Sequence, residues 1–478
     1  RVMTITPESS ALDIAAAIRN GEVGPVEVAE MYLDRIEGRG EELNAIIWLD
    51  RDDTLRRARE SEARVRAGEA RPFEGVPIPI KDLANVAGQP NTMSSLSVSD
   101  VPRTETDIDV RLLEEAGFVL LGRSNSPEFG PLTSAENARH GKTRNPWGLG
   151  HTSGGSSGGA SAAVAGGLAP IAHASDGGGS IRIPASITGL VGLKPSRGRV
   201  PAEVRGWEHS ITSGVITRTV ADTAAALDVL SPFDPLAWYS APAPVRPFAE
   251  EVGADPGRLR IGLLTESPTG LDVDGANVEA ALAAARALEA LGHAVEPVSP
   301  FLFTPEARAG FVDLVINASM FAAPYEDVEK VDPYIRHRID AARGFHAGQY
   351  AQLAERLQLE TRRVNAQFGR DFDLLLTPTM AVATPEVGVV YDEANEDPTG
   401  PRFTEMRQVT FTSWVNISGL PAISLPVHTD ERGLPVGAQL VGGPFGEDAL
   451  IRVAAQLEPV FEWQRRLAPW LSPAGGPR

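Results

Sequence analysis

The sequence predicts an α/β fold with one large mixed, mostly parallel twisted sheet that helices cover on both faces. Strand-like and helix-like patterns alternate through both halves of the 478 residues. Residues 259–298 read as strand, helix and strand, which is the order of a parallel βαβ unit. Neither an internal repeat nor a break in composition marks a second domain, so we expect a single one.

The first part of the chain predicts two helices and a strand. Apolar residues recur every three to four positions over residues 9–35, and Asn20-Gly21 interrupts the pattern, so we expect two helices there. Residues 75–80 form a short apolar run that contains prolines, which is typical of a strand at a sheet edge. This run ends directly before Lys81, which therefore leaves an apolar segment.

The middle of the chain alternates between apolar and polar segments. We expect a helix at 111–116, a strand at 118–122 and a long polar loop region at 123–152. Residues 160–174 are small and apolar and read as a buried helix, although Gly166, Gly167 and Pro170 interrupt them. The run is shorter than the roughly 20 residues that a membrane span needs.

The C-terminal half begins with a Pro- and Ala-rich connector at 227–257. A strand at 259–264, a helix at 278–291 and a strand at 294–298 follow it. Residues 301–372 are mostly helical in pattern, and 373–377, 422–426 and 437–441 read as buried strands.

The composition is that of a folded protein with an acidic surface. Apolar residues make up 42% and charged residues 22%, close to the globular average. Acidic residues outnumber basic ones by 63 to 44, a net charge of −19, so the field of the protein repels nucleic acid and anionic lipid. The chain has no cysteine, which excludes disulfides, thiolate metal sites and a cysteine nucleophile. Since the start lacks a signal-peptide pattern, we expect a cytoplasmic protein that binds neither nucleic acid nor membranes.

Two glycine-rich segments carry the residues for which we expect chemistry. In residues 154–159 four glycines surround Ser156 and Ser157, and glycine lets a backbone approach a ligand closely. Structured segments flank this run, which favours a functional loop over a flexible linker. In residues 175–184 three consecutive glycines precede Ser180, and N–H groups in such a run can point into one cavity and stabilise an oxyanion.

With these segments, the chain resembles the amidase signature family over nearly all of its length. The motifs are GGSSGGAS at 154–161, DGGGSIRIP at 176–184 and a Lys-Asp pair after GVP. Lys81 precedes Ser156 by 75 positions and Ser156 precedes Ser180 by 24, and the second interval is characteristic of the family. Supporting matches are RNPW at 144–147, GLKP at 192–195, RTVAD at 218–222 and NISGLP at 416–421. The chain departs from the family at Ser175, where threonine is usual, and at Gly177, where the residue is often larger.

The resemblance implies a Ser-cisSer-Lys triad. Ser180 would be the nucleophile, Ser156 would relay its proton from a cis peptide bond, and Lys81 would be the base. A lysine acts as a base for serine only if burial lowers its pKa, and the apolar run before Lys81 favours that. The oxyanion hole would be formed by the N–H groups of Gly177, Gly178, Gly179 and Ser180. Residues that would support the site without reacting are Gly155, Ser157, Ser175, Asp176 and Arg182.

The resemblance also implies the organisation of the chain and its substrates. We expect one amidase signature domain over 1–478, with an N-terminal helical region (1–70), a catalytic core (75–225), a connector (226–257) and a C-terminal α/β part with pocket helices (258–478). Within the family the chain is most similar to bacterial hydrolases of nylon-oligomer cyclic amides, aryl amides and carbamates, including metagenomic urethanases.

The expected reaction is cleavage of a small uncharged linear or cyclic amide, an anilide or a carbamate through an acyl-enzyme. It would need no metal and no organic cofactor, in a monomer or homodimer. We expect residues 123–140, Trp207, 301–334 and Trp414 to contribute to the substrate pocket.

Two alternatives remain at the level of sequence. The pattern Gly154-x-Ser156-x-Gly158 also matches the nucleophile elbow of an α/β-hydrolase-type esterase with a Ser-His-Asp triad, for which His428 is the candidate base. The residues before Ser156 do not fit this motif, because the elbow should follow a buried strand and residues 145–153 are polar. The chain also resembles the A subunit of glutaminyl/aspartyl-tRNA amidotransferases, which works with partners and ATP, and the acidic composition argues against contact with tRNA.

Overall fold

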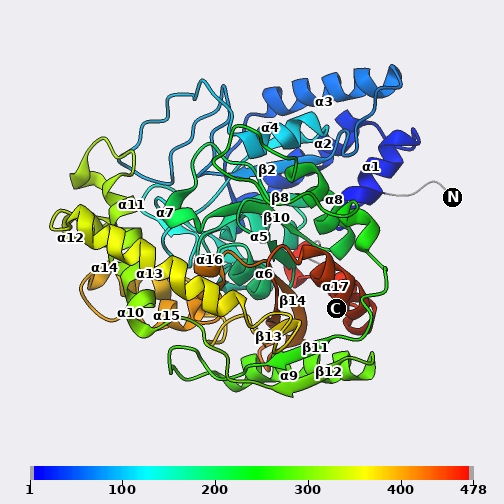
Figure 1. The fold of residues 1–478 in the computed structure, drawn as a ribbon. Helices are drawn as coiled ribbons and strands as arrows, with labels where there is room; N and C mark the ends of the chain where they lie inside the picture. The colour runs from blue at the N-terminus through cyan, green and yellow to red at the C-terminus, as the bar shows by residue number, and fades with distance from the viewer. Residues whose placement is uncertain (1–4, 473–478) are drawn as a thin grey trace.

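The computed structural model describes residues 5–472 (Figure 1). A small sheet of order β1-β3-β2 lies beside the N-terminal helices. Its strands are β1 (Ile46–Trp48), β2 (Pro77–Lys81) and β3 (Val119–Ser124), and β2 pairs in parallel with β3. The helices of this region are α1 (Ala11–Arg19), α2 (Pro25–Arg39), α3 (Arg51–Arg66) and α4 (Ile108–Glu115). The two predicted N-terminal helices and the strand that ends at Lys81 are thus confirmed.

Side-chain caps define where two of these helices begin. The Ser10 side chain accepts a hydrogen bond from the N–H of Asp13, and Asp50 accepts one from the N–H of Asp53. Such caps satisfy N–H groups that have no partner within the helix.

The main sheet has eight strands in the order β12-β11-β13-β15-β14-β9-β10-β8. The strands are β8 (Ile171–Asp176), β9 (Val191–Lys194), β10 (Thr212–Thr217), β11 (Arg260–Leu263), β12 (Ala294–Pro297), β13 (Leu374–Pro378), β14 (Ala422–Thr429) and β15 (Pro435–Gly442). The α/β fold with a large mixed sheet is therefore confirmed. The expected parallel majority is wrong, because only β11 with β12 and β11 with β13 pair in parallel, while the other five pairs are antiparallel.

Inserted strands explain this difference. The helix α6 (Arg182–Thr188) connects β8 to β9, which point the same way because both are antiparallel to β10. Since β10 lies between them, no parallel pair forms. In the same way β15 separates β13 from β14. The alternation of strands and helices predicts which strands are parallel, but it does not predict which later strand is inserted between them.

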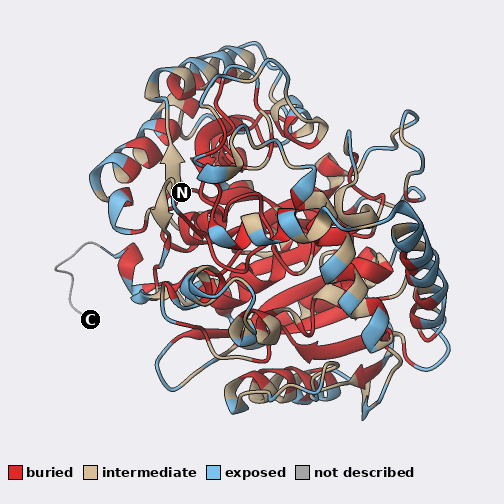
Figure 2. Ribbon diagram, turned by 90° about the vertical axis from the view of Figure 1, so that its left-hand side faces the viewer, coloured by how far each residue is buried: buried red, intermediate tan, exposed pale blue. Residues whose placement is uncertain are grey.

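Helices cover both faces of the main sheet, as expected. Along β15, Ala438 and Leu440 face the core that includes α9 (Gly275–Ala290) and α17 (Glu447–Phe461). On the other face, Gly437 and Gln439 form hydrogen bonds with Ser186 and Arg182 of α6. Figure 2 shows the strands as buried between these layers. Two further helices near the sheet are α5 (Gly158–Ala165) and α8 (Val220–Leu230).

Two predictions for the middle of the chain need correction. The expected helix at 160–174 ends at Ala165, and β8 begins at Ile171, because Gly166-Gly167 and Pro170 stop the helix. The expected loop at 123–152 contains two short hairpins. Their strands are β4 (Glu136–Asn137), β5 (Gly141–Lys142), β6 (Arg144–Asn145) and β7 (Gly148–Thr152).

A group of helices gathers on one side of the sheet, at the left of Figure 1. Its members are α10 (Pro305–Gly310), the π-helix η3 (Phe311–Ile316), α11 (Asn317–Phe321), α12 (Pro333–Ala342), α13 (Ala347–Asn365), α14 (Val389–Glu396), α15 (Phe403–Val409) and α16 (Ser413–Ser418). This confirms the mostly helical pattern of residues 301–372. Across residues 5–472, every helix is too short or too polar to cross a membrane.

Candidate active site

Lys81 lies at the end of β2, inside a cluster of serine oxygens. Its side chain is fully buried. Its Nζ lies 2.6 Å from Ser156 Oγ, 2.8 Å from Ser157 Oγ and 3.1 Å from Ser175 Oγ. Burial lowers the pKa of Lys81 to about 7, and the negative charge of Asp176 opposes this only in part. The amine is thus able to take up a proton near neutral pH.

Ser156 follows a cis peptide bond from Gly155. The loop that contains it connects β7 to α5. Gly155 packs against the backbone of residues 133–134, and an added Cβ would lie 2.5 Å from the N atom of Ser134. Only glycine fits at this position, which explains one glycine of the first motif.

Ser180 lies in the loop between β8 and α6, which we call the oxyanion loop (177–181). The residue is 8% exposed, and its carbonyl accepts a hydrogen bond of 3.2 Å from the N–H of Ser157. This contact places Ser180 next to the cluster around Lys81. Within residues 5–472 no hydrogen bond joins the Ser180 hydroxyl to Ser156.

One of the four N–H groups expected in the oxyanion hole is not free. The N–H of Gly179 donates to Asp176 Oδ1 at 2.8 Å. The Asp176 carboxylate is fully buried and needs donors, and it also accepts from the N–H of Ile181 at 3.0 Å. The N–H groups of Gly177, Gly178 and Ser180 remain as candidates.

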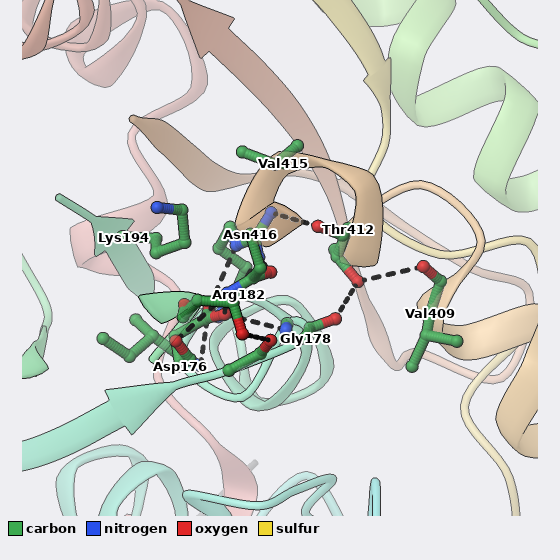
Figure 3. A network of polar contacts seen from close by, with 12 residues as sticks. Asp176, Gly178, Arg182, Lys194, Val409, Thr412, Val415 and Asn416 are labelled. Carbon is green, nitrogen blue, oxygen red and sulfur yellow. Dashed lines mark hydrogen bonds and ion pairs between the residues drawn. The ribbon is translucent and has the colours of Figure 1, made fainter. Parts of the chain in front are cut away.

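A buried polar network holds the oxyanion loop (Figure 3). The Arg182 guanidinium pairs with Asp176 through bonds of 2.9 and 3.0 Å, and Asn416 Nδ2 donates to Asp176 Oδ1 at 2.8 Å. Burial alone would raise the pKa of Asp176, but the Arg182 guanidinium holds this pKa well below its usual range. The Thr412 hydroxyl donates to the carbonyl of Gly178 at 2.7 Å. Asp176 and Arg182 thus contact the oxyanion loop together with residues of α16 and its N-terminus.

Sequence reasoning missed two residues behind Lys81. The N–H of Lys81 donates to His173 Nδ1 at 3.3 Å, and His173 Nε2 lies 2.9 Å from Asp109 Oδ2. Since Nδ1 accepts, Nε2 carries the hydrogen and donates to the carboxylate. Neither residue belongs to one of the glycine-rich motifs, and no other motif marks them. They fix the backbone of the lysine that contacts the serines.

A cavity of about 490 Å³ opens in front of the oxyanion loop. Ser180, Gly178 and Trp207 line it, together with parts of 130–133 and 305–316 that the sequence predicts. Trp414 does not line it, because this side chain is fully buried in the hydrophobic core beside Val415. Parts of 400–413 and Arg338 also line the cavity, and no sequence pattern predicts them.

Breaking the buried ion pair under the loop is expected to destabilise the fold. In Arg182→Met the Asp176 carboxylate loses its cation, and removing one partner of such a pair costs about 3–5 kcal/mol. Urea unfolding followed by circular dichroism measures this loss. The control is Arg286→Met, which breaks an exposed pair with Glu279 that is worth under about 1 kcal/mol. Equal stability of the two variants would show that the network does not hold the loop.

Comparison with known proteins decides which family has this arrangement. The family model described as Amidase matches residues 27–451. The chain belongs to the amidase signature family. The curated 6-aminohexanoate-cyclic-dimer hydrolase of Paenarthrobacter ureafaciens is 36% identical to this amidase, and the match covers 96% of each chain. The protein is thus a carbon–nitrogen hydrolase that cleaves amide bonds.

Solved structures of amidases share the whole fold. The structure of 6-aminohexanoate cyclic dimer hydrolase complexed with substrate superposes with a TM-score of 0.91 at 33% identity, over 98% of this chain and 100% of the other. A bacterial aryl acylamidase of the amidase signature family superposes with a TM-score of 0.85 at 29% identity, over 98% and 99% of the two chains.

The structure speaks against the esterase alternative. Ser156 follows β7, whose middle residues are exposed and whose ladder partner is the two-residue strand β6. A nucleophile elbow instead follows a buried strand. His428 lies on β14 and, in the described chain, forms no hydrogen bond with either serine. Residues 5–472 also hold no group of three His, Asp or Glu side chains that could bind a metal ion.

Proposed function

We propose that this amidase cleaves small linear or cyclic amides, anilides and carbamates through an acyl-enzyme, with Ser180, Ser156 and Lys81 as its catalytic triad. The observation that carries this proposal is the contact of 2.6 Å between Lys81 Nζ and Ser156 Oγ, deep in the protein and beside Ser180. The names of the relatives, a cyclic dimer hydrolase and an aryl acylamidase, support the amide and anilide classes. Carbamates share the same acyl carbon bonded to nitrogen.

The first step forms the acyl-enzyme. The neutral Lys81 amine takes a proton from Ser156, which takes one from Ser180, while Ser180 Oγ bonds to the substrate carbonyl carbon. The N–H groups of Gly177, Gly178 and Ser180 would stabilise the oxyanion of the tetrahedral intermediate. The C–N bond then breaks, and the proton returns through Ser156 to the leaving nitrogen.

The second step releases the acid. Water attacks the acyl carbon and gives a proton through Ser156 to Lys81. The bond between the acyl carbon and Ser180 Oγ then breaks, and the proton returns through Ser156 to Ser180 Oγ. The enzyme ends in its starting protonation state. A carbamate follows the same course, and its acyl part is released as carbon dioxide and an alcohol.

The pH dependence follows from the base. Only a neutral amine accepts a proton, and burial lowers the pKa of Lys81 to about 7. We therefore expect kcat/KM for a neutral 4-nitroanilide to rise with pH through an apparent pKa near 7 and then to level off. Initial rates from pH 5 to 9.5, with the fold monitored by circular dichroism, measure this profile. A rate that falls steadily above neutrality in folded protein would contradict the proposal.

A substrate panel separates the classes that the proposal joins. Release of the amine or alcohol is measured for a 4-nitroanilide, a lactam, an aryl carbamate and an ester of matched size. Burst release of 4-nitroaniline before steady state would reveal the acyl-enzyme. Hydrolysis of the ester alone would contradict the proposal.

A further inference from the structure

Two arginines line the substrate cavity around one tyrosine. Arg338 lies in α12, and Arg402 lies directly before α15. Arg338 Nη2 and Arg402 Nη1 both donate to the Tyr334 hydroxyl, at 2.5 and 2.6 Å. Their guanidinium carbons lie 4.6 and 4.9 Å from the centre of the Tyr334 ring. Both arginines face the cavity that Ser180 lines.

The charge of Arg338 has no anionic partner. The side chain is only 4% exposed, and its other contact is a bond of 2.7 Å from Nη1 to Asn317 Oδ1. Its Nε has no hydrogen-bond partner, and no ion pair of Arg338 exists within residues 5–472. Arg182 and Arg199, which are also buried, each pair with a carboxylate. A buried cation without a counter-charge is costly, so it calls for a functional reason.

The surrounding charges leave an excess of one positive charge. Arg402 pairs with Glu405 at 2.7 Å, which compensates one of the two guanidinium groups. Arg308 and Asp313 also line the cavity, and their opposite charges leave the balance unchanged. Beyond its two bonds from Nη1, Arg402 has no partner within the described chain for Nε or Nη2. Arg402 therefore offers unused donors, and Arg338 contributes an uncompensated positive charge.

We propose that Arg338 and Arg402 form a subsite that binds a carboxylate of the substrate, so that the preferred amides are acidic. A guanidinium group matches a carboxylate in shape and charge and binds it strongly where water is excluded. This proposal rests on the proposed function, because it places the acidic group in the cavity of Ser180. It differs from the uncharged substrate that the sequence predicts.

Two matched substrate pairs test the subsite. In the first pair, the mono-4-nitroanilide of adipic acid carries a free carboxylate on the acyl side, and the 4-nitroanilide of hexanoic acid has none. In the second pair, an acetanilide with a 4-carboxylate carries the charge on the amine side, and the 4-methyl acetanilide is neutral. We expect kcat/KM of the acidic member to exceed that of the neutral one by roughly ten- to a hundredfold in at least one pair. This ratio of kcat/KM, acidic over neutral, should be smaller in Arg338→Gln and in Arg402→Gln. In the wild type it should also decrease as salt is added.

The controls keep the test decisive. Arg336 lies on the same helix but outside the cavity, and its side chain donates to the carbonyl of Val328. In Arg336→Gln the ratio of kcat/KM for the acidic and neutral substrates should therefore match that of the wild type. Arg402 is 17% exposed at its side chain, so Arg402→Gln carries the test if Arg338→Gln does not fold. Equal rates for both members of both pairs in the wild type, or a preference that survives in both variants, would overturn the subsite.

Binding to Ser180→Ala separates this proposal from the assignment of the nucleophile. Isothermal titration calorimetry with the same four compounds reads the subsite without turnover. Tighter binding of an acidic member, lost in Ser180→Ala/Arg402→Gln, supports the subsite even if Ser180 is not the nucleophile. Equal affinity for acidic and neutral members overturns it even if Ser180→Ala is inactive.

Discussion

Replacing Ser180 by alanine is expected to lower the turnover of a 4-nitroanilide by at least about a thousandfold. The variant keeps the cavity and the oxyanion loop but lacks the atom that bonds to the substrate carbon. A fluorophosphonate should label the wild type once, and peptide mapping should place the label on Ser180. The variant should not be labelled.

The fold should not change in this variant. The contact that positions Ser180 is made by its backbone carbonyl, which alanine retains. An unchanged urea midpoint would show that the loss lies in the chemistry. A label on Ser156, or substantial activity in Ser180→Ala, would mean that the elbow-like motif supplies the nucleophile after all.

Replacing Lys81 by methionine is expected to cost about a hundredfold to ten thousandfold in kcat/KM, the usual contribution of a general base. Methionine suits the fully buried position, so the loss should not come from unfolding. The rise of kcat/KM with pH near 7 should also disappear. Rates of the variant from pH 5 to 9.5 measure both effects.

Lys194→Met is the matched control for Lys81. Lys194 is also buried, and burial lowers its pKa to about 7. Its Nζ donates to the carbonyl of Pro195 at 2.7 Å, and it forms no hydrogen bond with the serines around Lys81. This variant should keep the pH profile of the wild type. A pH profile that changes in Lys194→Met but persists in Lys81→Met would show that Lys194, and not Lys81, is the base.

Local patterns in the sequence predicted the elements near the site. The apolar run before Lys81 is β2, and residues 259–298 form β11, α9 and β12 in the expected parallel arrangement. These features depend on neighbouring residues alone. The order of the main sheet depends on where β10 and β15 are inserted, and no pattern within a strand records that.

The same division holds for the site. The resemblance to the amidase signature family predicted that Lys81 and Ser156 meet, although 75 positions separate them. It did not predict that the N–H of Gly179 turns to Asp176, because that depends on how many donors a buried carboxylate needs. Nor did it predict Arg338, which lies on a helix with an ordinary pattern and acquires its role only from the cavity around it.

The brace under the oxyanion loop has a consequence for synthesis of the chain. All three proposed catalytic residues are part of the growing chain once residue 180 is translated, yet Asn416, which bonds to Asp176, comes 240 positions later. Gln439, which bonds to Arg182, comes later still. A nascent chain or an N-terminal fragment therefore carries the reactive side chains without the framework that aims them. The oxyanion loop therefore gains its full set of bracing hydrogen bonds only after the residues up to Gln439 have folded around it.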